Sequence, residues 1–176
     1  NHIVVGSGEL VNAKEVLTKQ ELQRFESARK SDKTVFIISP EEAGNTTVTR
    51  PVQNGKVTWH FKMENTRDVA FASAKNFIWD AARVNLPSGK LSLAQSVYTK
   101  EDEGKEAWGR STEYVKASIE HYSKTWFEYP YPNAVNVAGN VSGMEYPGVS
   151  FCGASSSGAE LWEVTDHEFG HNWFPM

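Results

Sequence analysis

The stretch TDHEFGHNWFPM, residues 165–176, contains the pattern His-Glu-x-x-His at His167, Glu168 and His171. On an α-helix, residues four apart lie about 40° apart around the axis and about 6 Å apart along it. Both imidazole rings therefore project from one face, where they can hold one metal ion. Zinc suits such a pair, because imidazole nitrogens bind it at about 2.0 to 2.1 Å. The stretch predicts a helix with a zinc site, in which His167 and His171 are two of the metal ligands.

Glu168, directly after the first histidine, is the candidate general base. Bound zinc lowers the pKa of its water toward about 7, and a neighbouring carboxylate can then take the proton and pass it to a leaving amine. The alternative is a surface helix on which two histidines fall one turn apart. Phe169 and Trp173 fit both interpretations, since any packed helix needs apolar residues. The motif alone leaves the two open.

A catalytic zinc site uses three protein ligands and leaves the fourth position to water. One large class of such helices adds a His six residues after the second His of the motif, and has a Gly three residues after that second His. Phe174 stands at the place of that Gly, so this class is excluded. The other class adds a Glu nineteen positions past the second His, which would fall after Met176. We therefore expect a Glu as the third ligand, in sequence that follows this chain.

A long helix and two β-like runs are predicted before the zinc helix. The long helix is indicated by residues that recur at spacings of four and three, namely Trp108, Thr112, Val115, Ile119, Tyr122 and Trp126. It should end before EYPYP (128–132), whose prolines cannot continue a helix. The runs AVNVA (134–138) and GVSFC (148–152) flank GNVSGMEYPG (139–148). The last helix is expected from about residue 158 to about residue 172.

The first half of the chain is predicted to be mainly β. Short strands are expected at 3–5 and in TVFIIS (34–39), and a helix begins at the capping box TKQE (18–21). The pair Asn54-Gly55 lies between two alternating runs and predicts a β-hairpin. Further strands are favoured by the aromatic and β-branched content of 68–86 and 90–99. A charged link follows, so we divide the chain into a β domain at 1–98 and a second domain at 99–176.

Composition limits the class of protein and its partners. The 176 residues are 39% hydrophobic and 23% charged, which is typical of a globular protein and not of a disordered one. The net charge of −4 comes with mixed signs along the chain, so nucleic acid is not an expected partner. No apolar run approaches the roughly 20 residues that a membrane span needs. The lone Cys152 does not decide the compartment, for which an extracytoplasmic location, periplasmic or secreted, is preferred.

GMEYPGVSF (143–151) followed by HEFGHNWF (167–174) resembles the gluzincin zinc aminopeptidases, the aminopeptidase N-like family, in which a Gly-x-Met-Glu-Asn stretch precedes the zinc helix. WHFKMENTRDVAF (59–71) is similar to the closing strands of that family's N-terminal β domain, and WFEYPYP (126–132) to the start of its catalytic domain. The resemblance implies an α+β fold: the end of a β-rich N-terminal domain, then the first part of a thermolysin-like domain. That part would hold a long helix, a small antiparallel sheet with a substrate-binding edge strand, and the zinc helix.

The resemblance also implies roles for single residues. It makes His167 and His171 zinc ligands, Glu168 the general base, and Glu145 the carboxylate that binds the free α-amine of a peptide substrate. Gly143 and its neighbours, Met144 and Glu145, would form the edge strand on which the peptide backbone pairs. Tyr146 replaces the usual Asn of the family stretch, and Pro175 should end or kink the zinc helix early. Glu145 can also be an ordinary turn carboxylate, and an endopeptidase stays an alternative.

We therefore expect an internal piece of a zinc aminopeptidase, acting on peptides with a free N-terminus. The isolated chain should be inactive, because the third ligand and the family's transition-state-stabilising Tyr lie downstream. A noncatalytic peptide-binding or protein-binding module with a degenerate peptidase fold is the alternative from another class. Self-association is expected if the apolar face of the zinc helix lacks partners, and that face holds Leu161, Val164, Phe169 and Trp173.

Overall fold

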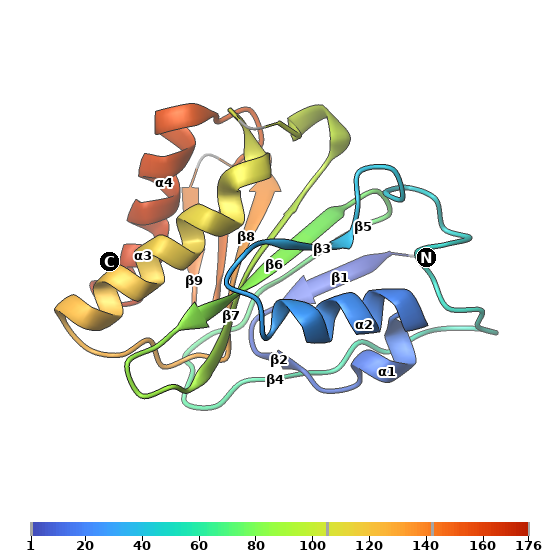
Figure 1. Ribbon diagram of the computed structural model, residues 1–176, viewed down its shortest axis with the longest axis horizontal. Coiled ribbons are helices and arrows are strands. Elements are labelled where there is room, and N and C mark those ends of the chain that lie inside the picture. Colours follow the sequence, from blue (N-terminus) through green and yellow to red (C-terminus); the bar gives the residue numbers. More distant parts are fainter. Residues whose placement is uncertain (1, 105, 142, 176) are drawn as a thin grey trace.

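A six-stranded mixed sheet forms the centre of the computed structural model, which describes residues 2–104, 106–141 and 143–175 (Figure 1). Its strand order is β3-β6-β7-β8-β10-β9. The bounds are β3 (Val35–Ile38), β6 (Ile78–Asn85), β7 (Leu91–Tyr98), β8 (Asn133–Gly139), β9 (Gly143–Tyr146) and β10 (Val149–Gly153). The pairs β7–β8 and β8–β10 are parallel, and the other three pairs are antiparallel. The fold is therefore α+β, with β9 at the edge of the sheet.

Helices cover both faces of this sheet. On one face α3 (Ser111–Thr125) and α4 (Gly158–Gly170) lie side by side (Figure 1). Thr112 of α3 donates a hydrogen bond to Asp80 on β6, whereas the next residue, Trp79, contacts Phe25 of α2 (Lys19–Ala28). Because successive side chains of a strand point to opposite faces, α2 lies on the face opposite α3. The short helix α1 (Ala13–Val16) precedes α2.

Two small sheets lie beside the main one. They pair β1 (Ile3–Gly6) with β5 (Phe71–Ala74), and β2 (Glu9–Leu10) with β4 (Phe61–Lys62). Two short 3-10 helices, η1 (Lys100–Asp102) and η2 (Trp108–Arg110), connect β7 to α3. No helix in the described part of the chain is long and apolar enough to cross a membrane.

Several predicted elements are confirmed with their local causes. The capping box at the start of α2 is formed in both directions, with Glu21 N donating to Thr18 Oγ1 and Thr18 N donating to Glu21 Oε2. The strands expected at 3–5, 34–39, 68–86 and 90–99 correspond to β1, β3, β5 with β6, and β7. The runs at 134–138 and 148–152 correspond to β8 and β10. The last helix, expected from about residue 158 to about residue 172, corresponds to α4.

The predicted hairpin at Asn54-Gly55 is wrong. Gly55 has the left-handed φ of +87° that a turn favours, yet the flanking run at 51–60 forms no strand. The strand that follows, β4, pairs with β2 instead, which sets Phe61 opposite Leu10. Leu10 is buried in that pairing. The burial of an apolar side chain by a distant segment therefore prevailed over the local turn signal.

The predicted small antiparallel sheet is also corrected, because the sheet is larger and mixed. The chain passes from β7 through α3 to β8, and such a helical crossover brings the two strands together in parallel. The sheet thus takes strands from both sides of residue 98. The division into domains at 1–98 and 99–176 stays a prediction. Trp108 was expected inside the long helix but lies in η2, three residues before α3 begins at Ser111.

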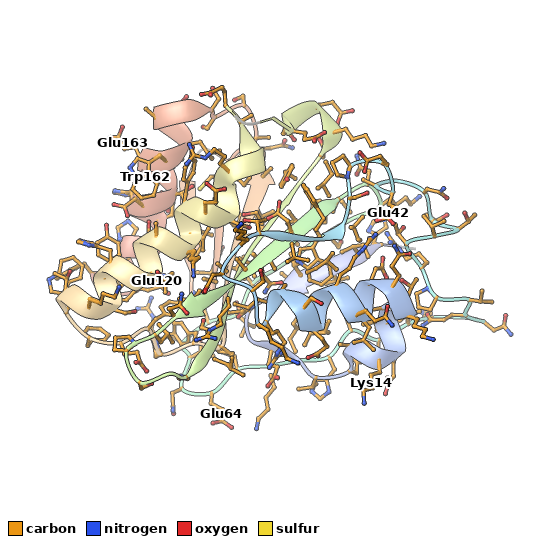
Figure 2. All side chains as sticks on the ribbon, viewed as in Figure 1. Lys14, Glu42, Glu64, Glu120, Trp162 and Glu163 are labelled. Carbon is orange, nitrogen blue, oxygen red and sulfur yellow. The ribbon has the colours of Figure 1, made fainter. Side chains whose placement is uncertain are left out.

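The apolar face of α4 is covered within the chain. Leu161 and Phe169 are fully buried and Trp173 is 7% exposed. Phe169 and Trp173 pack with Val115 and Ile119 of α3 in one hydrophobic cluster. On the outer side of α4, Trp162 and Glu163 point away from the sheet (Figure 2). These buried residues do not supply exposed surface for self-association, which stays a prediction.

Candidate active site

α4 brings the two histidines of the motif together. His167 lies in its last turn, and His171 follows its last residue with helical dihedral angles, φ −62° and ψ −15°. The two Nε2 atoms are 3.1 Å apart, and the ring planes meet at 87°. Two nitrogens that each lie at 2.0 to 2.1 Å from one tetrahedral ion are about 3.3 Å apart. The pair therefore has nearly the separation that a shared zinc ion requires.

The turn after α4 orients the ring of His171. Its Nδ1 lies 2.9 Å from the carbonyl oxygen of Phe174. A carbonyl can only accept, so Nδ1 carries the proton and Nε2 presents its lone pair toward His167. Pro175 follows directly, and α4 has ended at Gly170, as the proline predicted. This early end places the Phe174 carbonyl under the ring, so it favours the tautomer that binds a metal.

A carboxylate oxygen of Glu168 lies within 4.8 Å of a ring nitrogen of His171, and Glu168 is 6% exposed. Burial raises the pKa of its carboxyl, and the negative charge of Glu145 adds to the rise, while the nearby His167 and His171 act in the opposite direction. A carboxylate with a raised pKa accepts a proton more readily. The surroundings therefore suit Glu168 to the role of a general base.

β9 runs past this carboxylate. It pairs antiparallel with β10, with Glu145 opposite Ser150 and Gly143 opposite Cys152. A methyl group added to Gly143 would overlap Oε1 of Glu168, so the carboxylate keeps its present position only because residue 143 is a glycine. Alternation along the strand puts Gly143 and Glu145 on one face and Met144 on the other. Met144 is 39% exposed and points away from the histidines.

The structure brings together most of the residues that the sequence singled out. Ligand atoms of Glu145, Glu168 and His171 all lie within 4.8 Å of one another, and His167 joins them through the contact between the two rings. Gly143 lies against Glu168, while Met144 is outside this group. The roles given to these residues stay predictions. Two imidazoles and two carboxylates that face the same space form a set of donor groups that fits zinc.

A cavity of about 220 Å³ opens beside this group. Glu145 and His171 line it, together with Asn65, Arg67 and Tyr131. Sequence reasoning missed the last three as site residues. Asn65 has a left-handed φ of +52°, the one such non-glycine residue in the described part of the chain, and strained backbone often occurs at functional sites. No sequence pattern indicated that this loop between β4 and β5 returns to α4.

A second feature that sequence reasoning missed holds α4 on α3. The carboxylate of Asp166 accepts hydrogen bonds from Ser118 Oγ and Tyr122 OH, both at 2.6 Å. The ring of Tyr122 also lies against Gly170, where a side chain would meet it at 3.7 Å. Residues 118 and 122 lie on one helix face, so their spacing could have indicated that they share a partner. It could not have identified that partner as Asp166. Asp166 directly precedes His167, so these bonds fix the direction of the histidine pair.

Comparison with known proteins gives structural matches only. No family model matches the chain, and no curated protein does either. Among solved structures, the chain is similar to aminopeptidase A of Legionella pneumophila in complex with aspartic acid, with a TM-score of 0.50 and 15% identity. The match covers 58% of this chain and 14% of that protein. At this identity the likeness shows the fold alone.

Two weaker matches are to M1 zinc metallopeptidases. One is a mutant enzyme from Deinococcus radiodurans, with a TM-score of 0.40, 18% identity, and coverage of 54% of this chain and 21% of that one. The other is a two-domain M1 zinc metallopeptidase mutant bound to L-tryptophan, with a TM-score of 0.42, 13% identity, and coverage of 65% and 29%. This chain therefore spans less than a third of the length of each of these three proteins.

Proposed function

We propose that this chain is part of a zinc-dependent metallopeptidase, an aminopeptidase that removes residues from the free N-terminus of peptides. The observation that carries the proposal is the arrangement around His167 and His171. Their Nε2 atoms are 3.1 Å apart, and the carboxylates of Glu168 and Glu145 converge on the same space. The fold likeness to an aminopeptidase supports the same conclusion.

His167 and His171 would hold the zinc ion, with the expected downstream Glu as third ligand. When bound, zinc acidifies water and polarises the scissile carbonyl. Glu168 would take the proton from the attacking water and return it to the leaving amine. Its burial suits this exchange, because burial raises the pKa of the carboxyl and so strengthens it as a proton acceptor.

The neighbouring residues would bind and position the peptide. The outer edge of β9 is free of a strand partner in the described part of the chain, so a peptide backbone can pair with it. Glu145 would bind the α-ammonium group, since a fixed negative charge next to the metal limits the cut to the first residue. The cavity beside Glu145 would receive the side chain of that residue.

Zinc binding by the chain itself is the first test. We expect it to bind one zinc ion, and the variants His167→Ala and His171→Ala to bind it at least about tenfold more weakly. His60→Ala removes an exposed histidine far from the motif and is the control. A chromophoric chelator that competes for zinc measures the affinities. Equal affinity in all four proteins would reject His167 and His171 as the metal site.

Peptidase activity is the second test, with fluorogenic Ala or Leu substrates. We expect no robust turnover by the 176-residue chain. A longer natural chain with a Glu nineteen positions after His171 should turn over, and Glu168→Gln should reduce its rate about 10²-fold to 10⁴-fold. Blocking the substrate amine should slow cleavage, and Glu145→Gln should remove that preference. Zinc binding without any turnover in the longer chain would favour a binding module instead.

A further inference from the structure

A second cavity lies on the other face of the sheet, away from α3 and α4. Its volume is about 140 Å³. Residues of β1, β2, α2, β4, β6, β7 and β8 line it. A cavity of about 150 Å³ in a protein core holds a benzene molecule. The space therefore fits one aromatic ring and is too small for a peptide.

The walls of this cavity are mainly apolar. Phe25 and Trp79 form one side, with ring centroids 5.7 Å apart, and they are 5% and 2% exposed. Leu93 and Val5 add aliphatic surface, and both are buried. Such walls favour an apolar ring over any hydrophilic ligand.

Ser92, Gln95 and Asn133 bring polar groups to this apolar space from the sheet. Gln95 lines the cavity and is only 5% exposed. It lies opposite Ala81 of β6, two residues along from Trp79, so both side chains are on the same face. Trp79 Nε1 donates a hydrogen bond to Gln95 Oε1 over 3.0 Å, and this bond fixes which end of the amide is oxygen.

The other end of that amide is a donor without a protein acceptor. Gln95 Nε2 makes no hydrogen bond to any residue in the described part of the chain. Because Gln95 lines the cavity, this amide N–H₂ is available to a molecule that enters it. A ligand that brings a hydrogen-bond acceptor into the cavity would satisfy it.

The charge around the cavity selects the kind of acceptor. Arg29 and Glu9 also line it, and they pair with each other at 3.4 Å, so their charges offset. Moving a carboxylate from water into apolar surroundings without a free cation costs much more than moving a neutral carbonyl. The ligand should therefore be uncharged.

We propose that this cavity binds a neutral molecule with one aromatic ring and a carbonyl group, whose oxygen accepts a hydrogen bond from Gln95 Nε2. The ring lies against Phe25, Trp79 and Leu93. This site shares no residue with the group around His167 and His171. The proposal therefore stands or falls separately from the peptidase function.

Benzamide, toluene and benzoate are suitable probes for the 176-residue chain. Titration followed by ¹H–¹⁵N NMR reports on the indole N–H of Trp79. We expect benzamide to shift this signal in a saturable way and to bind about fivefold to tenfold more tightly than toluene, which lacks the acceptor. Benzoate should bind more weakly than benzamide. No saturable shift of Trp79, or equal affinity for toluene and benzamide, would overturn the proposal.

Gln95→Glu tests the donor and keeps the shape of the side chain, while it also brings a carboxylate to the cavity wall. The acceptor for Trp79 remains and the shape is kept, but the free N–H₂ becomes an oxygen. We expect benzamide to lose its advantage over toluene at pH 8. Gln23→Glu makes the same chemical change on the exposed side of α2 and should leave the preference intact. If Gln95→Glu proves poorly folded, the comparison of the three probes on the unmodified chain still decides whether the cavity binds such a ligand. If a folded Gln95→Glu keeps the preference for benzamide, the assignment of Gln95 Nε2 as the donor is wrong.

Discussion

Gly143 shows at the scale of one residue how β9 and α4 depend on each other. The methyl group of Gly143→Ala would overlap Glu168 Oε1, and the carboxylate can escape by rotating about its own side-chain bonds. We therefore expect little loss of stability but about a 10²-fold loss of peptidase activity in a chain long enough to turn over, because the base is displaced. Gly139→Ala is the control, since its added carbon meets Phe151 at an ordinary 3.6 Å. Steady-state kinetics and urea unfolding of both variants would check this; normal activity in Gly143→Ala would show that the contact is unimportant.

Asp80 gives a second prediction for a single residue. It is 1% exposed, and it accepts hydrogen bonds from Tyr98 and Thr112. Burial raises the pKa of its carboxyl to about 7, although these hydroxyl groups act to lower it. Between about pH 4, the usual value for Asp, and pH 7, the unfolded chain therefore releases a proton that the folded chain keeps. Ionisation of Asp80 in the unfolded chain thus lowers the free energy of unfolding as pH rises through this window.

Asp80→Asn removes this titration. We expect the stability of the unmodified chain, relative to Asp80→Asn, to fall as pH rises from 4 to 7 and to level off above 7. Urea unfolding at several pH values measures the difference. Asp68→Asn, on an exposed loop, should follow the unmodified chain. Parallel stability curves for Asp80→Asn and the unmodified chain would mean that Asp80 does not titrate in this range.

At the scale of elements, the attachment of α4 to α3 decides where the histidine pair points. Tyr122→Phe and Ser118→Ala each remove one hydroxyl donor to Asp166. Hydrogen bonds to a charged group contribute about 1.5 to 3 kcal/mol, so each variant should lose about that much stability and also bind zinc more weakly. Tyr114→Phe, on the same helix, is the control, since the Tyr114 hydroxyl makes no hydrogen bond in the described part of the chain. Unfolding in urea and zinc competition would test both effects; unchanged zinc affinity in the two variants would limit Asp166 to a purely structural role.

Across the whole molecule, sequence patterns predicted those features that depend on residues close together in the sequence. The spacing of His167 and His171 predicted their contact, and the capping box at Thr18 predicted the start of α2. The mixed order of the sheet, and the return of Asn65 to α4, depend on contacts between distant segments that no local pattern encodes. The same reason explains the failed hairpin at Asn54-Gly55, where pairing with β2 replaced the local turn.

Asn133 of β8 joins the N-terminal segment to the second half of the chain, a contact that no local sequence pattern indicated. Its Nδ2 donates to the carbonyl of Gly6, and its Oδ1 accepts from the N–H of Gly8, at 2.8 and 2.9 Å. A second bond runs from Ser7 Oγ to the carbonyl of Pro147, in the turn between β9 and β10. The first residues of the chain are thus hydrogen-bonded to β8 and to the turn that follows β9, the strand that carries Glu145, so the N-terminal segment supports the candidate site.

Asn133→Leu would keep the size of the side chain and leave two buried backbone groups of Gly6 and Gly8 unpaired. Each such group costs about 1 to 3 kcal/mol, so we expect the free energy of unfolding to fall by about 2 to 6 kcal/mol. Because these bonds join segments far apart in the sequence, the loss should appear in one cooperative urea transition. Hydrogen exchange at the Gly8 amide measures the local effect, and Asn54→Leu on an exposed loop is the control. Faster exchange at Gly8 without a shift of the global transition would instead mean that the N-terminal strands open on their own, as a separate unit that residues 1–98 would form.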